Sequence, residues 1–215
     1  ALNNNVQEIV LTGVDLTSWG KDFKERKSLG ILLKIIFSSL PDLPRLRVSS
    51  IDPAEIDHEF MDILADEERF MPHLHLSIQH GDDLILKRMK RRHLYRDVIN
   101  FVDEAKRIRP DIIFGADFIS GFPTENDQSH QNSIKLIKEA DIKYAHIFPF
   151  SPRKETPAYK MKLLPKEVIN YRAKELRDII KTKTELFLKS IVGRRQKVLI
   201  EKNKSGYTPQ FSRVK

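Results

Sequence analysis

The chain has 215 residues, of which 40% are hydrophobic and 32% are charged, and its formal net charge is +8. This length allows one domain with a large core, or one domain and part of a second. No apolar run approaches the roughly 20 residues that a membrane helix needs, and no basic, short-apolar leader opens the chain, so a cytoplasmic protein without a membrane anchor is expected. The absence of cysteine excludes disulfides, a cysteine nucleophile and a thiolate-held metal within these residues.

Short β-rich apolar runs alternate with helical patterns through residue 150. Strands are expected at 8–13, 45–51, 73–79, 111–122 and 144–151. Helices are expected at 28–40, 53–66, 82–89, 95–108 and 126–140, with Ser28 and Asp52 as N-caps and Pro53 in the first turn. This alternation predicts parallel strands with right-handed crossovers.

The predicted fold class is α/β, either an open doubly wound sheet or a (β/α) barrel. Five consecutive units and the lack of a Gly-x-Gly-x-x-Gly turn favour a barrel or part of one, residues 1–164. A long charged helix is expected over 165–192. Residues 193–215 contain the short strand patterns QKVLIE and SGYTPQFSRV, typical of the start of a small β module. Because Ala1 falls in what reads as the tail of a helix, a trimmed fragment is expected.

Polar residues gather where the predicted strands end, which is where parallel α/β folds bind ligands. Capping and turn formation also explain Ser, Asp and Gly at such positions, and for Asp52 and Gly13 this structural explanation is favoured. For Gln79 and Asp117 a functional role is favoured, because a polar side chain inside an apolar strand must find a partner. The candidate ligand-binding residues at these strand ends are Gly13, Ser49, Ser50, Gln79, Asp117, Gly121 and Phe148.

His73 and His75 alternate with leucines and are expected on one strand face. Two histidines at this spacing can bind metal, but no third ligand of the right type stands close by in the sequence. A hydrogen-bonding role is therefore favoured, and no metal ligand is assigned.

Basic residues cluster between Lys87 and Arg96 and again between Arg194 and Lys197, as suits a polyanion such as RNA. A solvated helix face is an equally good reading of the composition alone.

Six motifs occur in order: EIVLTGVDLTSWG, RLRVSSIDP, PHLHLSIQHGDDLILKRMKRRH, DFISGFPTEN, HIFPFSPRKETPAYKM and GYTPQFSRV. Together they resemble the methylthiotransferases of the radical S-adenosylmethionine (SAM) superfamily over nearly the whole chain. LTGVDLTSWG and GYTPQF resemble most the branch that adds a methylthio group to threonylcarbamoyladenosine beside the anticodon of tRNA. The sister branches, which act on isopentenyladenosine in tRNA or on a ribosomal protein, remain alternatives.

The resemblance implies that Ile119 supports the adenine of SAM, that Gly121 allows a tight turn, and that Ser49, Ser50, Gln79 and Asp117 offer polar contacts. Phe148 would close the pocket. His80 and Glu155 depart from the family's usual residues, and His80 leaves open what lies near the reacting face. The implied RNA-binding residues are Arg88, Arg91, Arg92, Arg153, Arg194 and Arg195.

The resemblance also implies two [4Fe-4S] clusters held by cysteines upstream of this chain, a reducing partner such as flavodoxin or ferredoxin, tRNA as substrate, and a TRAM-type RNA-binding domain beginning at residue 193. In such enzymes reduction of SAM yields an adenosyl radical, and a second SAM supplies the methyl group. The present residues alone would be inactive. A cluster-free RNA-binding relative and an ordinary barrel enzyme for phosphate substrates are the alternatives from other classes.

Overall fold

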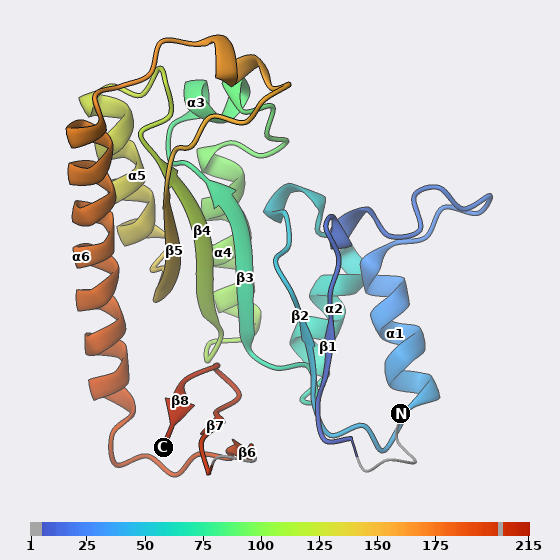
Figure 1. Ribbon diagram of the computed structural model, residues 1–215. Coiled ribbons are helices and arrows are strands. Elements are labelled where there is room, and N and C mark those ends of the chain that lie inside the picture. Colours follow the sequence, from blue (N-terminus) through green and yellow to red (C-terminus); the bar gives the residue numbers. More distant parts are fainter. Residues whose placement is uncertain (1–5, 202–203) are drawn as a thin grey trace.

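The computed structural model describes residues 6–201 and 204–215, and its central feature is a set of five parallel strands (Figure 1). The strands are β1 (Ile9–Leu11), β2 (Leu46–Val48), β3 (His73–Gln79), β4 (Ile113–Ser120) and β5 (Tyr144–Pro149). β1 pairs with β2, and β3, β4 and β5 form a second sheet in sequence order. Two isolated parallel bridges, Leu46 with Phe70 and Ile51 with Leu76, join the sheets. The α/β prediction of a partial barrel with parallel strands is confirmed.

Helices cover one face of this curved sheet, and the other face is open in the view of Figure 1. They are α1 (Leu29–Ser39), α2 (His58–Asp66), α3 (Asp83–Arg88), α4 (Tyr95–Ile108), α5 (Asp127–Glu139) and α6 (Lys166–Ile191). Short 3-10 turns span Leu16–Ser18, Pro53–Glu55 and Pro157–Lys160. The predicted cap of α1 is confirmed, since Ser28 Oγ accepts a hydrogen bond from the Ile31 amide at 3.3 Å.

The prediction of one helix from Pro53 to residue 66 is wrong. Asp52 caps only a 3-10 turn, and the chain is extended at Ile56 before α2 begins. Asp57 explains the break, because its carboxylate accepts from the Phe60 amide at 2.8 Å and from the Gly30 amide of α1 at 3.1 Å. A second cap that also ties two helices together replaces one continuous helix.

The core lies between the strands and the helices. Leu74, Leu76 and Ile78 of β3 and Phe114 and Phe118 of β4 are fully buried on the helix side. The alternate residues of the same strands face the open side, as strand periodicity dictates, and in β3 they are all polar. β3 thus has an apolar back and a polar front, whereas the front of β4 also carries Ile113 and Ile119.

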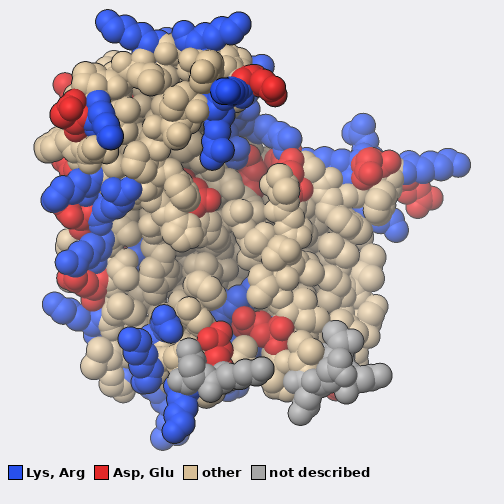
Figure 2. All heavy atoms as spheres, in the orientation of Figure 1, with Lys and Arg blue, Asp and Glu red and all other residues tan. Residues whose placement is uncertain are grey.

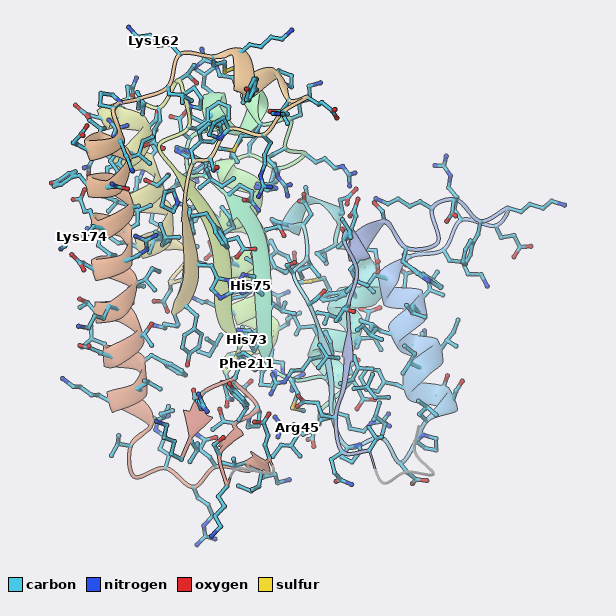
Figure 3. The ribbon with its side chains drawn as sticks, in the orientation of Figure 1. Arg45, His73, His75, Lys162, Lys174 and Phe211 are labelled. Atoms are coloured by element: carbon cyan, nitrogen blue, oxygen red, sulfur yellow. The ribbon has the colours of Figure 1, made fainter. Side chains whose placement is uncertain are left out.

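The last segment forms an antiparallel three-stranded sheet of β6 (Leu199–Ile200), β7 (Gly206–Tyr207) and β8 (Arg213–Val214). It lies at the end of the molecule where the central strands begin (Figure 1). Arg47 donates to the carbonyls of Pro209 and Thr208 at 2.8 and 2.9 Å, and Phe211 stacks on His73 with ring centroids 5.0 Å apart. Side chains of the barrel interior thus hold this sheet; Figure 3 shows Arg45, His73 and Phe211 gathered there.

Candidate functional site

A pocket of about 720 Å³ opens where β3, β4 and β5 end. Gln79 comes from β3, Asp117 and Ile119 from β4, and Phe148 from β5, so parallel strands deliver them to one edge. Phe122 and Phe150 add an edge-to-face aromatic pair with centroids 5.4 Å apart. The remaining lining residues are Arg88, Met89, Lys90, Arg91, Pro149, Ser151, Arg153, Thr156, Pro157 and Ala158.

The pocket therefore combines flat apolar surfaces, a few polar groups and a cationic margin. Asp117 is its one acidic lining residue against four lysines and arginines. Figure 2 shows the charged side chains mainly around the margins of this face, with few at its centre. Such a combination suits a ligand that has both an aromatic ring and an anionic group.

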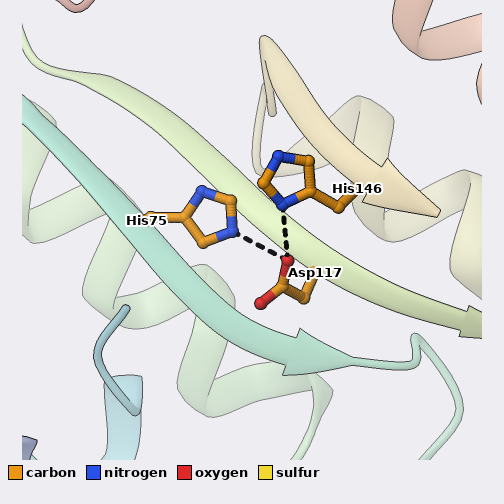
Figure 4. A group of neighbouring side chains, drawn as sticks. All are labelled: His75, Asp117 and His146. Atoms are coloured by element: carbon orange, nitrogen blue, oxygen red, sulfur yellow. Dashed lines mark hydrogen bonds and ion pairs between the residues drawn. The ribbon is translucent and has the colours of Figure 1, made fainter. Parts of the chain in front are cut away.

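Asp117 is oriented by two histidines from the neighbouring strands (Figure 4). Its Oδ1 accepts from His75 Nε2 of β3 and from His146 Nδ1 of β5, both at 3.0 Å. Burial alone would raise the pKa of Asp117, but the hydrogen bonds and positive charge of His75 and His146 outweigh burial and hold the pKa below its usual value. Asp117 is accordingly a carboxylate at neutral pH.

Gln79 ends β3 with a positive φ of 69°, in the left-handed region that only a few per cent of non-glycine residues adopt. The register between β3 and β4 is irregular between Leu76 and Gln79, so the strand bends as it reaches the pocket. Gln79, which lines the pocket, therefore has a strained backbone conformation.

The turn after β4 is built around Gly121 and Glu125. Gly121 has a φ of +80°, and a Cβ there would lie 2.7 Å from Ile169 of α6. The Gly121 amide donates to Glu125 Oε2 at 2.9 Å, and the same oxygen accepts from His80 Nε2 at 3.0 Å. Arg172 of α6 pairs with Glu125 Oε1 at 2.9 Å. Gly121 thus makes the tight turn expected of it, without lining the pocket.

The buried network around Glu125 also fixes the position of the His80 side chain. Burial would raise the pKa of Glu125, but its bonds to His80 and Gly121 and the charge of Arg172 lower that pKa overall. His80 is 1% exposed and lines none of the pockets described here. The open question at His80 is answered by a structural role, and sequence reasoning missed its partner Glu125.

The other predicted ligand residues do not share the pocket. Ser50 lines a smaller, polar pocket of about 210 Å³ together with Asp52, Ser77 and Arg92. Lys90 and Arg91 line both pockets, so the two adjoin. Ser49 Oγ is buried without a hydrogen-bond partner in the described part of the chain, and Gly13 is exposed in the loop after β1.

The predicted RNA-binding arginines divide into three groups. Arg88 and Arg153 are exposed and line the large pocket. Arg91 donates to Asp52 Oδ2 at 2.9 Å and to the Ser77 carbonyl at 3.0 Å. Arg92 pairs with Asp15 at 3.2 Å and also with Glu55. Arg194 and Arg195 are exposed just beyond the far end of α6, at the opposite end of the molecule.

Sequence reasoning missed several residues of this region. The expectation that no third potential ligand lies near the histidine pair is wrong for His75, which meets Asp117 and His146. Period-two alternation along 144–149 places His146 on the face of Phe148 and was the available signal. His73 does not join this group and instead stacks on Phe211. Burial, and then the charges of Arg47 and His75, lower the pKa of His73 to about 3.

None of the helices in the described ranges is long and apolar enough to cross a membrane.

Comparison with known proteins gives a consistent result. Residues 1–137 match the Radical SAM superfamily. A threonylcarbamoyladenosine tRNA methylthiotransferase, MtaB, of Rickettsia prowazekii is 44% identical over 97% of this chain and 50% of its own length. The MtaB of Thermotoga maritima is 38% identical over 91% of this chain and 44% of its own. A tRNA-2-methylthio-N(6)-dimethylallyladenosine synthase of Paracoccus denitrificans is 34% identical. The chain thus spans about half the length of the curated relatives it matches.

Solved structures support the fold. The coproporphyrinogen III oxidase HemN of Escherichia coli, described as a radical SAM enzyme, superposes with a TM-score of 0.57 at 16% identity, over 72% of this chain and 37% of that one. The methyltransferase TsrM of Kitasatospora setae gives 0.53 at 16% identity, over 68% and 28%. Five parallel strands, a pocket at their carboxyl ends and a match over more than half of its length show that this chain belongs to the radical SAM superfamily.

Proposed function

We propose that this chain is the SAM-binding and substrate-facing part of a tRNA methylthiotransferase that modifies threonylcarbamoyladenosine. The observation that carries the proposal is the pocket of Gln79, Asp117, Ile119 and Phe148, whose mixed lining suits an adenosine-containing ligand. The 44% identity to an enzyme of that name over nearly the whole chain supports the choice of substrate.

The residues present fit SAM. Ile119, Phe148 and the Phe122–Phe150 pair offer apolar contact for an adenine ring, and Gln79 and Asp117 supply an amide and a carboxylate for hydrogen bonds. Ser49, Ser50, Gly13 and Gly121 remain proposed parts of the wider cofactor region, with Gly121 acting through the turn. SAM supplies the radical and the methyl group of the reaction, while these residues bind it, orient it and exclude water.

The residues present do not fit an iron–sulfur cluster. The sequence contains no cysteine, so ligands for the two proposed [4Fe-4S] clusters must come from residues outside this chain. We therefore assign no residue here to cluster binding. A flavodoxin or ferredoxin as reductant and a cytoplasmic location belong to the same proposal for the longer enzyme.

Transfer RNA is the proposed substrate, and Arg88 and Arg153 are the proposed phosphate contacts nearest the pocket. Arg91 and Arg92 contribute mainly through their ion pairs. The division into a barrel part (1–164), a linking helix (165–192) and the beginning of a TRAM-type domain (193–215) is part of the proposal, with Arg194 and Arg195 as a second RNA contact.

The test is a codon change at the native locus, so that the whole enzyme is present. Ile119→Glu places a charge against the proposed adenine site and should abolish the methylthio group on threonylcarbamoyladenosine, leaving the unmodified precursor in tRNA. Ile35→Glu is the matched control, because Ile35 is 46% exposed on α1. Mass spectrometry of tRNA nucleosides measures both.

Persistence of the methylthio group in the Ile119→Glu strain, with protein levels unchanged, would refute the pocket assignment. Loss of the methylthio group from isopentenyladenosine instead would show the sister activity. If deletion of the whole gene also leaves both methylthio groups in place, and the protein still binds tRNA, the RNA-binding relative is favoured.

A further inference from the structure

Three side chains from three adjacent strands converge on one point of the open sheet face (Figure 4). They are His75 of β3, Asp117 of β4 and His146 of β5, and one donor atom from each lies within 4.8 Å of the others. Asp117 and His146 are direct partners in the β4–β5 register, and His75 stands opposite Gly115 of β4. The strand ladder therefore fixes their spacing.

The room for this cluster comes from Gly115. A Cβ at Gly115 would lie 2.7 Å from His75 Nδ1, closer than real Cβ contacts come, so a side chain there would push the His75 ring away. The rings of His75 and His146 lie 5.2 Å apart between centroids, tilted by 33°, and both bond the same oxygen of Asp117. Glycine at this position is thus needed for the three groups to meet.

The donor set is one that binds borderline divalent metals. Imidazole nitrogen and carboxylate oxygen are common Zn²⁺ ligands at about 2.0–2.2 Å, which places donors of a tetrahedral site roughly 3.3 Å apart. The two nitrogen-to-Oδ1 distances are 3.0 Å, close to that spacing, and all three donors lie within 4.8 Å of one another, so the exposed His146 ring would turn inward to share an ion with His75 and Asp117. A single carboxylate with two imidazoles disfavours Mg²⁺ and Ca²⁺, which prefer more oxygen ligands.

The site is accessible. The His146 side chain is 70% exposed, whereas His75 and Asp117 are 18% and 23% exposed. His75 and Asp117 are thus held firmly by their surroundings. Because His146 is exposed, an ion can enter from its side, and water can take the fourth coordination position. Both histidines would present unprotonated nitrogens to the ion, with their protons on His75 Nδ1 and His146 Nε2.

We propose that His75, Asp117 and His146 form a binding site for a divalent transition metal ion, with Zn²⁺ as the best match. The site is distinct from any iron–sulfur cluster, because its ligands are imidazole and carboxylate groups of this chain. It borders the large pocket through Asp117, which lines that pocket. The proposal stands on these three side chains and does not depend on the proposed function.

The purified 215-residue chain allows a clean test, because it has no cysteine to compete for the metal. Zn²⁺ is titrated by calorimetry at neutral pH, and Co²⁺ is used to read coordination from visible absorption. We expect one ion per chain with micromolar or tighter affinity and the intense bands of a tetrahedral Co²⁺ site. His146→Ala and Asp117→Asn should each weaken binding by about a hundredfold or more.

His58→Ala is the matched control. His58 is an exposed histidine paired with Asp62 on α2 at 3.5 Å, outside the cluster, and its loss should leave affinity unchanged. His146→Ala alters an exposed side chain and Asp117→Asn keeps the shape, so circular dichroism should show folded variants. Failure of the folded parent chain to bind Zn²⁺ below millimolar concentration, or equal binding by the parent and both ligand variants, would overturn the proposal.

Discussion

At the scale of single residues, the polar positions of the open face could be predicted while their partners could not. Strand alternation places Asp117 and His75 on the same side as the pocket, and the rule that buried carboxylates need donors predicts a partner for Asp117. The identity of its partners depends on the register between strands, which brings together residues 29 and 42 positions apart and which local sequence does not encode. His146 was missed for that reason.

Gly121 gives a prediction at this scale. Gly121→Ala forces a left-handed backbone on a residue with a Cβ and drives that Cβ against Ile169, so we expect a loss of about 2–4 kcal/mol in the free energy of unfolding. Gly193→Ala shares the backbone problem, with φ +79°, but its Cβ would meet nothing within 4 Å, and it should cost only about 1 kcal/mol. Urea denaturation of both variants measures the difference; equal losses would contradict the packing argument.

Asp141 predicts a pH dependence of stability. Burial would raise the pKa of Asp141, but hydrogen bonds from Lys143 and Lys183 and the charge of Lys106 lower that pKa to about 2, below its ordinary value of 3.8. A depressed folded-state pKa adds stability that is complete above pH 4 to 5 and is lost as the pH falls through 4 toward 2. Because the side chain is 36% exposed, solvent screening reduces this contribution to about 1 kcal/mol.

The matched variant is Asp141→Asn, since asparagine tolerates the φ of +53° found there. It should lower the free energy of unfolding by about 1 kcal/mol at pH 7, with the difference from the parent shrinking as the pH falls from 4 to 2. Chemical denaturation at a series of pH values tests this. A difference independent of pH would show that the ion pairs do not matter.

At the scale of elements, the sequence predicted the existence and type of all five central strands and of the helices around them. Long periodic segments such as α4, which begins and ends where expected, carry enough signal in the chain itself. The break before α2 could not be predicted in this way. Asp57 accepts hydrogen bonds from amides of both α1 and α2, and its bond to the Gly30 amide is a tertiary contact that local sequence does not reveal. The attachment of the last sheet to the barrel also depends on tertiary contacts, and the sequence did not predict it.

One aromatic residue, Phe211, contributes to the attachment of the C-terminal sheet beside the hydrogen bonds of Arg47. Phe211 has a φ of +62°, unfavourable for a bulky side chain, and is held by stacking on His73 and on Tyr207 at 4.6 Å and by Arg47 at 5.1 Å. Phe211→Ala removes about 1–2 kcal/mol of ring contacts and should loosen the sheet selectively. Faster trypsin cleavage after Arg194, Arg195 and Lys197, relative to the control Val214→Ala, would report it. Unchanged cleavage would mean that the Arg47 hydrogen bonds suffice.

At the scale of the whole molecule, composition predicted an excess of positive charge without its distribution. α6 spans 26 residues, or about 39 Å, and separates the pocket end from Arg194 and Arg195. Ion pairs within the chain also occupy Arg91 and Arg92. The two basic clusters predicted from the sequence therefore lie at opposite ends of the molecule, and net charge could not reveal that two arginines of the first cluster are held in ion pairs.

RNA binding should follow this division. Arg88→Ala with Arg153→Ala removes two exposed charges beside the pocket and should reduce the slope of log affinity against log salt by roughly 1.4–1.8, at about 0.7–0.9 per phosphate contact. Arg92→Ala should change the slope by less, because its charge is already paired. Filter binding of tRNA to the longer enzyme over a salt series measures these slopes, and a larger effect of Arg92 would reverse the assignment.

The join between the two central sheets gives the molecule a weak seam. Among the described residues, isolated bridges at Leu46–Phe70 and Ile51–Leu76 link β1 and β2 to the longer ladders of β3 to β5. Cooperative opening units commonly follow such boundaries. Amide protons of β1 and β2 should therefore exchange with solvent deuterium together, through a partial opening that leaves those of β4 protected until the entire chain unfolds.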